Sequence, residues 1–142
     1  MTGTAATPSA AIPDGYVVQP SPRTVDDLLA RLDAALAARG LTVFARFDHA
    51  AAAAAVGLAM PALTVVAFGD PRAGTHLMLA NPAIGIELPV KMIVWADAAG
   101  ASHVAYTDPR WLAARYGVAE SPIVGKLTAM LAALATEISA PR

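Results

Sequence analysis

Four short segments rich in β-forming residues stand between two amphipathic helical segments, and this order constrains the fold more than any other feature. The helical segments cover residues 24–39 and 121–139. The β-rich segments between them are LTVFARFD, ALTVVAFGD, VKMIVWAD and HVAYT, and a further strand candidate, GYVVQP, precedes the first helix. The pattern predicts an α+β domain of the order β-α-β(4)-α, with a mainly antiparallel sheet and helices on one face.

Both helical segments show clear start signals and one apolar stripe each. Thr24 is the expected N-cap of the first helix, with Asp27 in the capping-box position, and Gly40 is its expected stop. Ser121 is expected to cap the last helix, with Pro122 at its first position. The stripes consist of Val25, Leu28, Leu29, Leu32 and Leu36, and of Ile123, Leu127, Met130, Leu131, Leu134 and Ile138. Stripes at this spacing are expected to pack on the sheet.

The remaining segments carry fewer structural signals. Residues 71–89 are interrupted by three prolines and two glycines, so we expect one or two helical turns there but no long helix. Residues 1–14 lack periodicity and are expected to form a loose tail, which leaves residues 15–139 as the ordered domain. A chain of 142 residues has the size of a single domain.

Composition excludes several classes of function and favours self-association. Ten basic against eleven acidic residues leave no basic patch for nucleic acid. No stretch of about 20 apolar residues escapes Pro, Gly or charge, so no membrane span is expected. The chain has no cysteine, which excludes disulfides and thiolate zinc sites, and its N-terminus lacks a signal-peptide pattern. We therefore expect a cytoplasmic protein. Because only 15% of residues are charged, we also expect self-association, as a homodimer or another small oligomer.

Four blocks of sequence carry a resemblance to a known family. FARFDHAAAAAAVGLAMP, VVAFGDPRAGTHLM, LPVKMIVWAD and VAYTDPRWLAARYGV follow one another as in the DUF302 family, small bacterial and archaeal domains of unassigned function. The resemblance covers roughly residues 15–139 and implies a TBP-like α+β fold, but no activity. This chain has Asp70, Arg72 and His76 where Asn, Lys and Pro are usual in the family.

An acid and a histidine stand side by side before six alanines. Asp48 is expected to cap the alanine helix. The positive end of the helix dipole disfavours a charged imidazolium in the first helical turn, so the ring of His49 tends to be neutral. A general base or a metal ligand needs a neutral ring. The alternative is that His49 makes a structural hydrogen bond. The resemblance includes the Asp-His pair, and this makes His49 a candidate functional residue.

A lysine interrupts the apolar run of the β-rich segment VKMIVWAD. Strand alternation places Lys91, Ile93 and Trp95 on one face and Met92 and Val94 on the other. Lys91 and Trp95 could therefore project into a common space, where a desolvated lysine could bind an anion or take part in carbonyl chemistry. A lysine on the surface at the start of a strand is the alternative.

The segment GDPRAGTH is a candidate anion site. Arg72 and Thr75 accompany two glycines, as in an anion-binding nest, and a tight turn is the alternative. The segment matches no nucleotide-binding motif. His76 and His103 also lack the spacing of a metal site.

Three classes of function stay open. The first, which asks least of the residues, is a small-ligand-binding domain with a pocket between sheet and helices, lined by His49, Met78, Lys91, Trp95 and Tyr106, with Arg72 and Thr75. The second is an enzyme with His49 as general base, oriented by Asp48, and Lys91 holding an anionic substrate. The third binds haem or another metal, with His49 or His76 as axial ligand. We expect Asp48, His49, Lys91 and residues 69–78 to surround one concavity.

Overall fold

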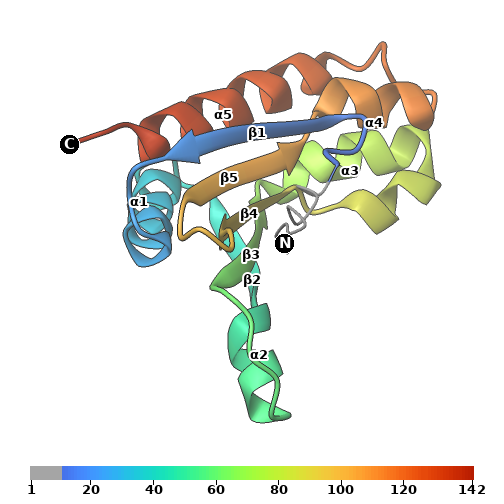
Figure 1. Ribbon diagram of the computed structural model, residues 1–142. Coiled ribbons are helices and arrows are strands. Elements are labelled where there is room, and N and C mark those ends of the chain that lie inside the picture. Colours follow the sequence, from blue (N-terminus) through green and yellow to red (C-terminus); the bar gives the residue numbers. More distant parts are fainter. Residues whose placement is uncertain (1–10) are drawn as a thin grey trace.

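The computed structural model describes residues 11–142 and shows a five-stranded antiparallel sheet in the order β1-β5-β4-β3-β2 (Figure 1). The strands are β1 (Tyr16–Ser21), β2 (Thr42–Asp48), β3 (Leu63–Gly69), β4 (Lys91–Ala96) and β5 (Ser102–Thr107). The helices are α1 (Val25–Ala38), α2 (His49–Ala55), α3 (Pro71–Ala80), α4 (Pro109–Arg115), α5 (Pro122–Ser139) and the 3-10 helix η1 (Pro82–Glu87). The predicted α+β class is confirmed. Of the predicted tail, residues 1–10 lie outside the described residues.

The two amphipathic helices cover one face of the sheet and form the core with it. The side chain of Thr24 accepts a hydrogen bond from the backbone N–H of Asp27, so the predicted cap of α1 is confirmed. Alternate strand residues meet the helices, and side chains without any exposed surface include Val66, Met92, Val94, Val104, Leu28, Leu32, Leu134 and Ile138. Both predicted apolar stripes therefore supply the core.

Helix α5 is held at its C-terminal end by residues from the beginning of the chain. Ser21 Oγ donates a hydrogen bond to the carbonyl oxygen of Ser139 at 2.9 Å, and Arg23 Nε donates to that of Ala140 at 2.6 Å. These side chains satisfy carbonyl groups that a helix end leaves without partners. By length and composition alone α5 is apolar enough to cross a membrane, but its apolar face packs in the core, as that of a core helix does.

The segment between β3 and β4 contains more helix than we predicted. Helix α3 has ten residues, close to three turns, where one or two turns were expected. Pro71 occupies a first-turn position, where no backbone N–H is needed, and Gly74 is tolerated inside the helix. Asn81 then ends α3 and caps η1, accepting a hydrogen bond from the backbone N–H of Ala83. The prolines therefore delimit the helices without preventing them.

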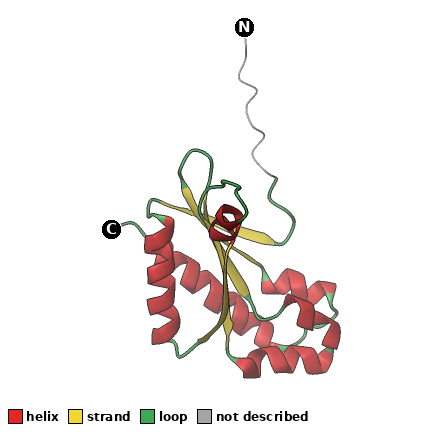
Figure 2. Cartoon of the chain, turned by 90° about the horizontal axis from the view of Figure 1, so that it is seen from below, coloured by secondary structure: helices red, strands yellow, loops and turns green. Residues whose placement is uncertain are grey.

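Residues 49–62 leave the sheet as a projecting arm, which consists of α2 and the segment returning to β3 (Figure 1). Figure 2 looks along this arm, with α2 seen end on. No residue of α2 is buried, and Val56 and Leu58 beyond it are 73% and 66% exposed. The alanines therefore do not serve close packing of α2 on the sheet of this chain.

The face of the sheet away from α1 and α5 carries half-buried apolar and aromatic side chains. The predicted alternation along β4 is confirmed, because Met92 and Val94 are fully buried whereas Ile93 and Trp95 are half-buried. Trp95 pairs with His103 of β5 and with Leu63 of β3, so these side chains share its face. We call this surface, with Tyr16 and Val18 of β1, the open face.

Candidate functional site

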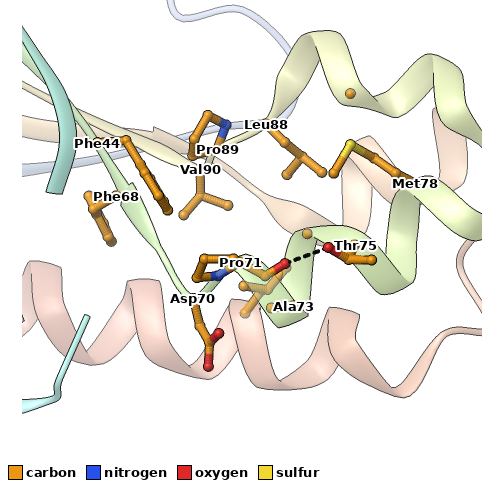
Figure 3. Close-up of a pocket in the computed structure, with 13 residues that line it drawn as sticks. Phe44, Phe68, Asp70, Pro71, Ala73, Thr75, Met78, Leu88, Pro89 and Val90 are labelled. Carbon is orange, nitrogen blue, oxygen red and sulfur yellow. Dashed lines mark hydrogen bonds between the residues drawn. The ribbon is translucent and has the colours of Figure 1, made fainter. Parts of the chain in front are cut away.

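An apolar cavity of about 250 Å³ lies where β3 meets α3, and we call it the α3 pocket (Figure 3). Its walls come from β2, β3, α3, α5, η1 and the segment between η1 and β4. Apolar side chains from these elements dominate the lining, namely those of Phe44, Phe68, Pro71, Ala73, Met78, Leu88, Pro89, Val90 and Leu127. Asp70 and Thr75 are its polar side chains.

Glycines keep the α3 pocket open. Gly74 lies on the pocket side of α3, where an added Cβ would come within 3.6 Å of a methyl group of Leu88. Gly85 of η1 faces Met78, and a Cβ there would lie 3.2 Å from the sulfur. A side chain at either position would narrow the space between α3 and η1. The cavity thus depends on residues that contribute no side chain.

The wall formed by η1 is fixed by polar contacts from three elements. Asn81 Nδ2 donates to the carbonyl oxygen of Tyr116 at 2.9 Å, and the Tyr116 hydroxyl donates to Glu87 Oε2 at 2.8 Å. Lys91 Nζ donates to the carbonyl oxygens of Glu87 and Pro89 at 3.1 and 3.0 Å. Burial lowers the pKa of Lys91. The ammonium group of Lys91 therefore tethers this wall, and its side chain does not line the α3 pocket.

The candidate anion nest is the start of α3, and the carboxylate of Asp70 occupies it. Asp70 Oδ1 accepts from the backbone N–H and from Nε of Arg72 at 3.0 and 3.1 Å, and Oδ2 accepts from Nη2 at 3.0 Å. These hydrogen bonds hold the pKa of Asp70 below its usual value. Thr75 Oγ1 donates to the carbonyl oxygen of Pro71. The segment is therefore neither an open anion nest nor a tight turn, because it forms the capped start of helix α3.

Asp48 and His49 lie where the arm leaves the sheet, away from the α3 pocket. Asp48 Oδ1 accepts from the backbone N–H of Ala51 at 2.9 Å, which confirms the predicted cap. Asp48 pairs with Thr64 near the start of β3, whereas the α3 pocket lies at the end of that strand. His49 is exposed, with its ring stacked on Phe47 at a centroid distance of 6.5 Å. The structure therefore does not gather the Asp-His pair, Lys91 and residues 69–78 around one concavity.

The other predicted site residues are dispersed as well. Thr75 and Met78 line the α3 pocket, but Trp95 lies on the open face. Tyr106 is buried on the opposite, helix-covered face, and burial raises its pKa. His76 of α3 does not line the α3 pocket but a neighbouring surface hollow, which Arg72 and Lys126 also line. Within residues 11–142, no three His, Asp or Glu side chains come together as metal ligands would.

Replacement of His49 by alanine tests whether its ring is structural. Because the ring is exposed, we expect the free energy of unfolding to change by less than about 0.5 kcal/mol. Asp48→Ala removes the cap of α2, worth about 1 kcal/mol, and should accelerate amide hydrogen exchange in the arm about fivefold. Chemical denaturation and hydrogen exchange measure the two effects. A loss of several kcal/mol in His49→Ala would show instead that the ring supports the fold.

Sequence reasoning missed a second constellation, on the open face. His103 Nε2 lies 2.8 Å from Asp97 Oδ2, and the ring of His103 stacks on Trp95 at a centroid distance of 5.1 Å. This hydrogen bond lowers the pKa of Asp97. Asp97, Trp95 and His103 line a hollow of about 550 Å³ above the open face. The signal in the sequence that could have found this constellation is the hairpin of β4 and β5, because its register puts Trp95 opposite His103.

Comparison with known proteins finds similar sequences in longer proteins. The chain is 37% identical over 112 residues to "Fluoride-specific ion channel FluC 1" of Brucella suis biovar 1 and of Brucella abortus biovar 1. Each match covers 78% of this chain and 44% or 42% of the relative. The chain therefore spans less than half the length of these curated relatives.

A solved structure and a family model agree on the fold. The crystal structure of an uncharacterized conserved protein DUF302 from Bacillus stearothermophilus matches with a TM-score of 0.77 at 18% identity, covering 89% of this chain and 99% of that one. The model of DUF302, a domain of unknown function, matches residues 17–137. On this evidence the chain belongs to the DUF302 family.

Proposed function

We propose that this domain binds a small, largely apolar molecule in the α3 pocket. The observation that carries the proposal is a concavity lined by apolar side chains and kept open by Gly74 and Gly85. Ligand sites in proteins combine such walls with a few polar groups that orient the ligand. The carboxylate of Asp70 and the hydroxyl of Thr75 are the side-chain groups of this kind here.

The chemistry around the pocket favours binding over turnover. The carboxylate of Asp70 accepts hydrogen bonds from Arg72, and the hydroxyl of Thr75 donates one to a backbone carbonyl. The ammonium group of Lys91 donates hydrogen bonds to two backbone carbonyl groups. A general base or a nucleophile needs a lone pair directed at the substrate. The predicted Asp-His pair lies at the arm and not at this pocket. We therefore place the small-ligand proposal at the α3 pocket, without the Asp-His pair and the lysine as ligand contacts.

Two glycine-to-alanine substitutions, one at the α3 pocket and one outside it as a control, test whether the pocket binds a ligand. Gly74→Ala adds a methyl group on the pocket side of α3 and should weaken the binding of toluene at least threefold. NMR titration measures the affinity for toluene. The same change should stabilise the chain by about 0.5–1 kcal/mol, since alanine favours helix. In both α3 and α5 the substituted glycine is the fourth helical residue and follows an initial proline.

Gly125→Ala is the control, because nothing lies within 4 Å of a Cβ built at that position of α5. It should raise stability by a similar amount and leave toluene binding unchanged. Equal toluene affinity in Gly74→Ala and the unchanged chain would contradict the proposal, as would equal weakening in both variants.

The named relatives bear on the wider context of the domain. They are called fluoride-specific ion channels, and this chain corresponds to less than half of each. In the described residues α5 alone could span a membrane by length and composition, and it is packed in the core. We propose that the shared part is a ligand-binding unit and not a pore. The absence of cysteine fits the cytoplasmic location that we propose for it.

We also propose that two copies of the chain associate through the arm. Residues 49–62 contain no Asp, Glu, Lys or Arg, and α2 is apolar around its whole circumference beyond His49. An all-apolar helix is normally buried, and one of seven residues has little stability of its own in water. In the described part of the chain β2, next to the arm, is an edge strand with mostly exposed residues. A second copy could cover both surfaces through a two-fold contact.

A further inference from the structure

We propose that the open face carries a second binding site, for a planar aromatic molecule that bears an N–H or O–H donor, built on Trp95 and His103. This site is separate from the α3 pocket and goes beyond the function proposed for it. The hollow measures about 550 Å³, within the usual range of about 300–1,000 Å³ for small-molecule sites. Leu63, Ile93 and Val18 complete its floor, and Ile12 and Pro13 stand at its rim.

The pairing of the strands fixes the aromatic part of this site. Trp95 stands between Leu63 and His103 in the registers of β3–β4 and β4–β5. The indole and imidazole planes are inclined by 26°, so the two rings form one stacked unit on rigid strands. Aromatic faces favour offset stacking or edge-to-face contact with further rings. A planar aromatic ligand is therefore the molecule that this floor complements.

The turn after β4 fixes the polar part of the site. Asp97 Oδ1 accepts hydrogen bonds from the backbone N–H groups of Ala99 and Ala101, both at 3.0 Å. Its other oxygen, Oδ2, faces His103 Nε2. The carboxylate is thus oriented by the turn and cannot swing away without losing both backbone hydrogen bonds. Asp97 thereby determines how the imidazole ring of His103 is presented.

This orientation leaves the second ring nitrogen of His103 as a hydrogen-bond acceptor. Of the two neutral tautomers of the ring, a carboxylate at Nε2 favours the one with its proton on that atom, and in this tautomer Nδ1 carries a lone pair. Within residues 11–142 the ring makes no other side-chain hydrogen bond. An acceptor beside an aromatic floor selects ligands that present a donor from the ring edge, such as indoles and phenols. This selectivity separates the site from a merely apolar surface.

Indole and 1-methylindole form a matched pair of probes, because only indole has an N–H donor. Equilibrium dialysis at about pH 8, above the ordinary range of imidazole protonation, measures both affinities for the full chain. We expect indole to bind about five- to tenfold more tightly than 1-methylindole, the effect of one hydrogen bond. Equal affinity for the two probes, or no binding of either, overturns the proposal.

Two substitutions in the site and one outside it complete the test. His103→Phe keeps a ring against Trp95 and should bind both indoles with the affinity that the unchanged chain shows for 1-methylindole. Trp95→Leu should weaken both at least tenfold. Gly74→Ala should leave the preference for indole over 1-methylindole unchanged, so that failure of the α3 pocket and failure of this site are distinguishable. Retained discrimination in His103→Phe, or a dimer that covers the open face, overturns the proposal.

Discussion

Leu58→Asp should convert the chain from a dimer to a monomer at micromolar concentration. Leu58 is 66% exposed on the arm that we propose as the contact between two copies. A carboxylate buried there without a partner should cost several kcal/mol, and about 3 kcal/mol corresponds to more than a 100-fold weaker association. Light scattering and sedimentation measure the change in mass. The fold of each copy should be unaffected, because no core residue changes.

Leu79→Asp is the matched control for this substitution. Leu79 lies on α3, outside the arm, and is 79% exposed. It should therefore leave the mass in solution unchanged while adding the same charge. If the unchanged chain is a monomer at micromolar concentration, or if Leu79→Asp alone dissociates it, the arm is not the contact.

Among the glycines of residues 11–142, Gly15→Ala should be the most destabilising single methyl addition. Gly15 has a φ of +80°, and a Cβ there would lie 2.4 Å from the Trp111 ring. The left-handed backbone costs an alanine about 1–2 kcal/mol, and displacement of the ring adds about 1–3 kcal/mol. We therefore expect the free energy of unfolding to fall by about 2–5 kcal/mol. Chemical denaturation measures it.

A double-mutant cycle separates the two causes. In a Trp111→Leu background the ring is absent, so Gly15→Ala should cost only the backbone strain of about 1–2 kcal/mol. The coupling between the two positions should then be about 1–3 kcal/mol. A cost that is independent of residue 111 would show that the ring moves aside freely.

The elements that sequence reasoning identified correctly are those with local signals. Thr24 and Asp48 act as caps because a side-chain oxygen can reach a backbone N–H two or three residues later, whatever the rest of the fold does. The alternation of Met92 and Val94 with Ile93 and Trp95 is likewise a local property of an extended chain. These signals were sufficient for the order of elements and for the covered face.

The candidate site could not be predicted because it depends on register and on contacts distant in sequence. The α3 pocket needs Phe44 of the edge strand, Gly85 of η1 and α3 to converge. His103 lacked a metal-site spacing, but the β4–β5 pairing gives it Trp95 and Asp97 as partners. A repeated motif also went unrecognised: Asp108-Pro109-Arg110 forms at α4 the same bidentate cap as Asp70-Pro71-Arg72 at α3.

The position of the arm has a consequence for how this domain can diversify. Because Asp48 and Thr64 are paired across antiparallel β2 and β3, the arm is in topological terms the loop of a β-hairpin. Lengthening a loop costs little in chain entropy, about 0.6 kcal/mol for each doubling. Insertions and deletions there can therefore arise without disturbing strand pairing or the core. Evolution can lengthen, shorten or exchange this one segment, and with it the contact that we propose for it, while the scaffold stays the same.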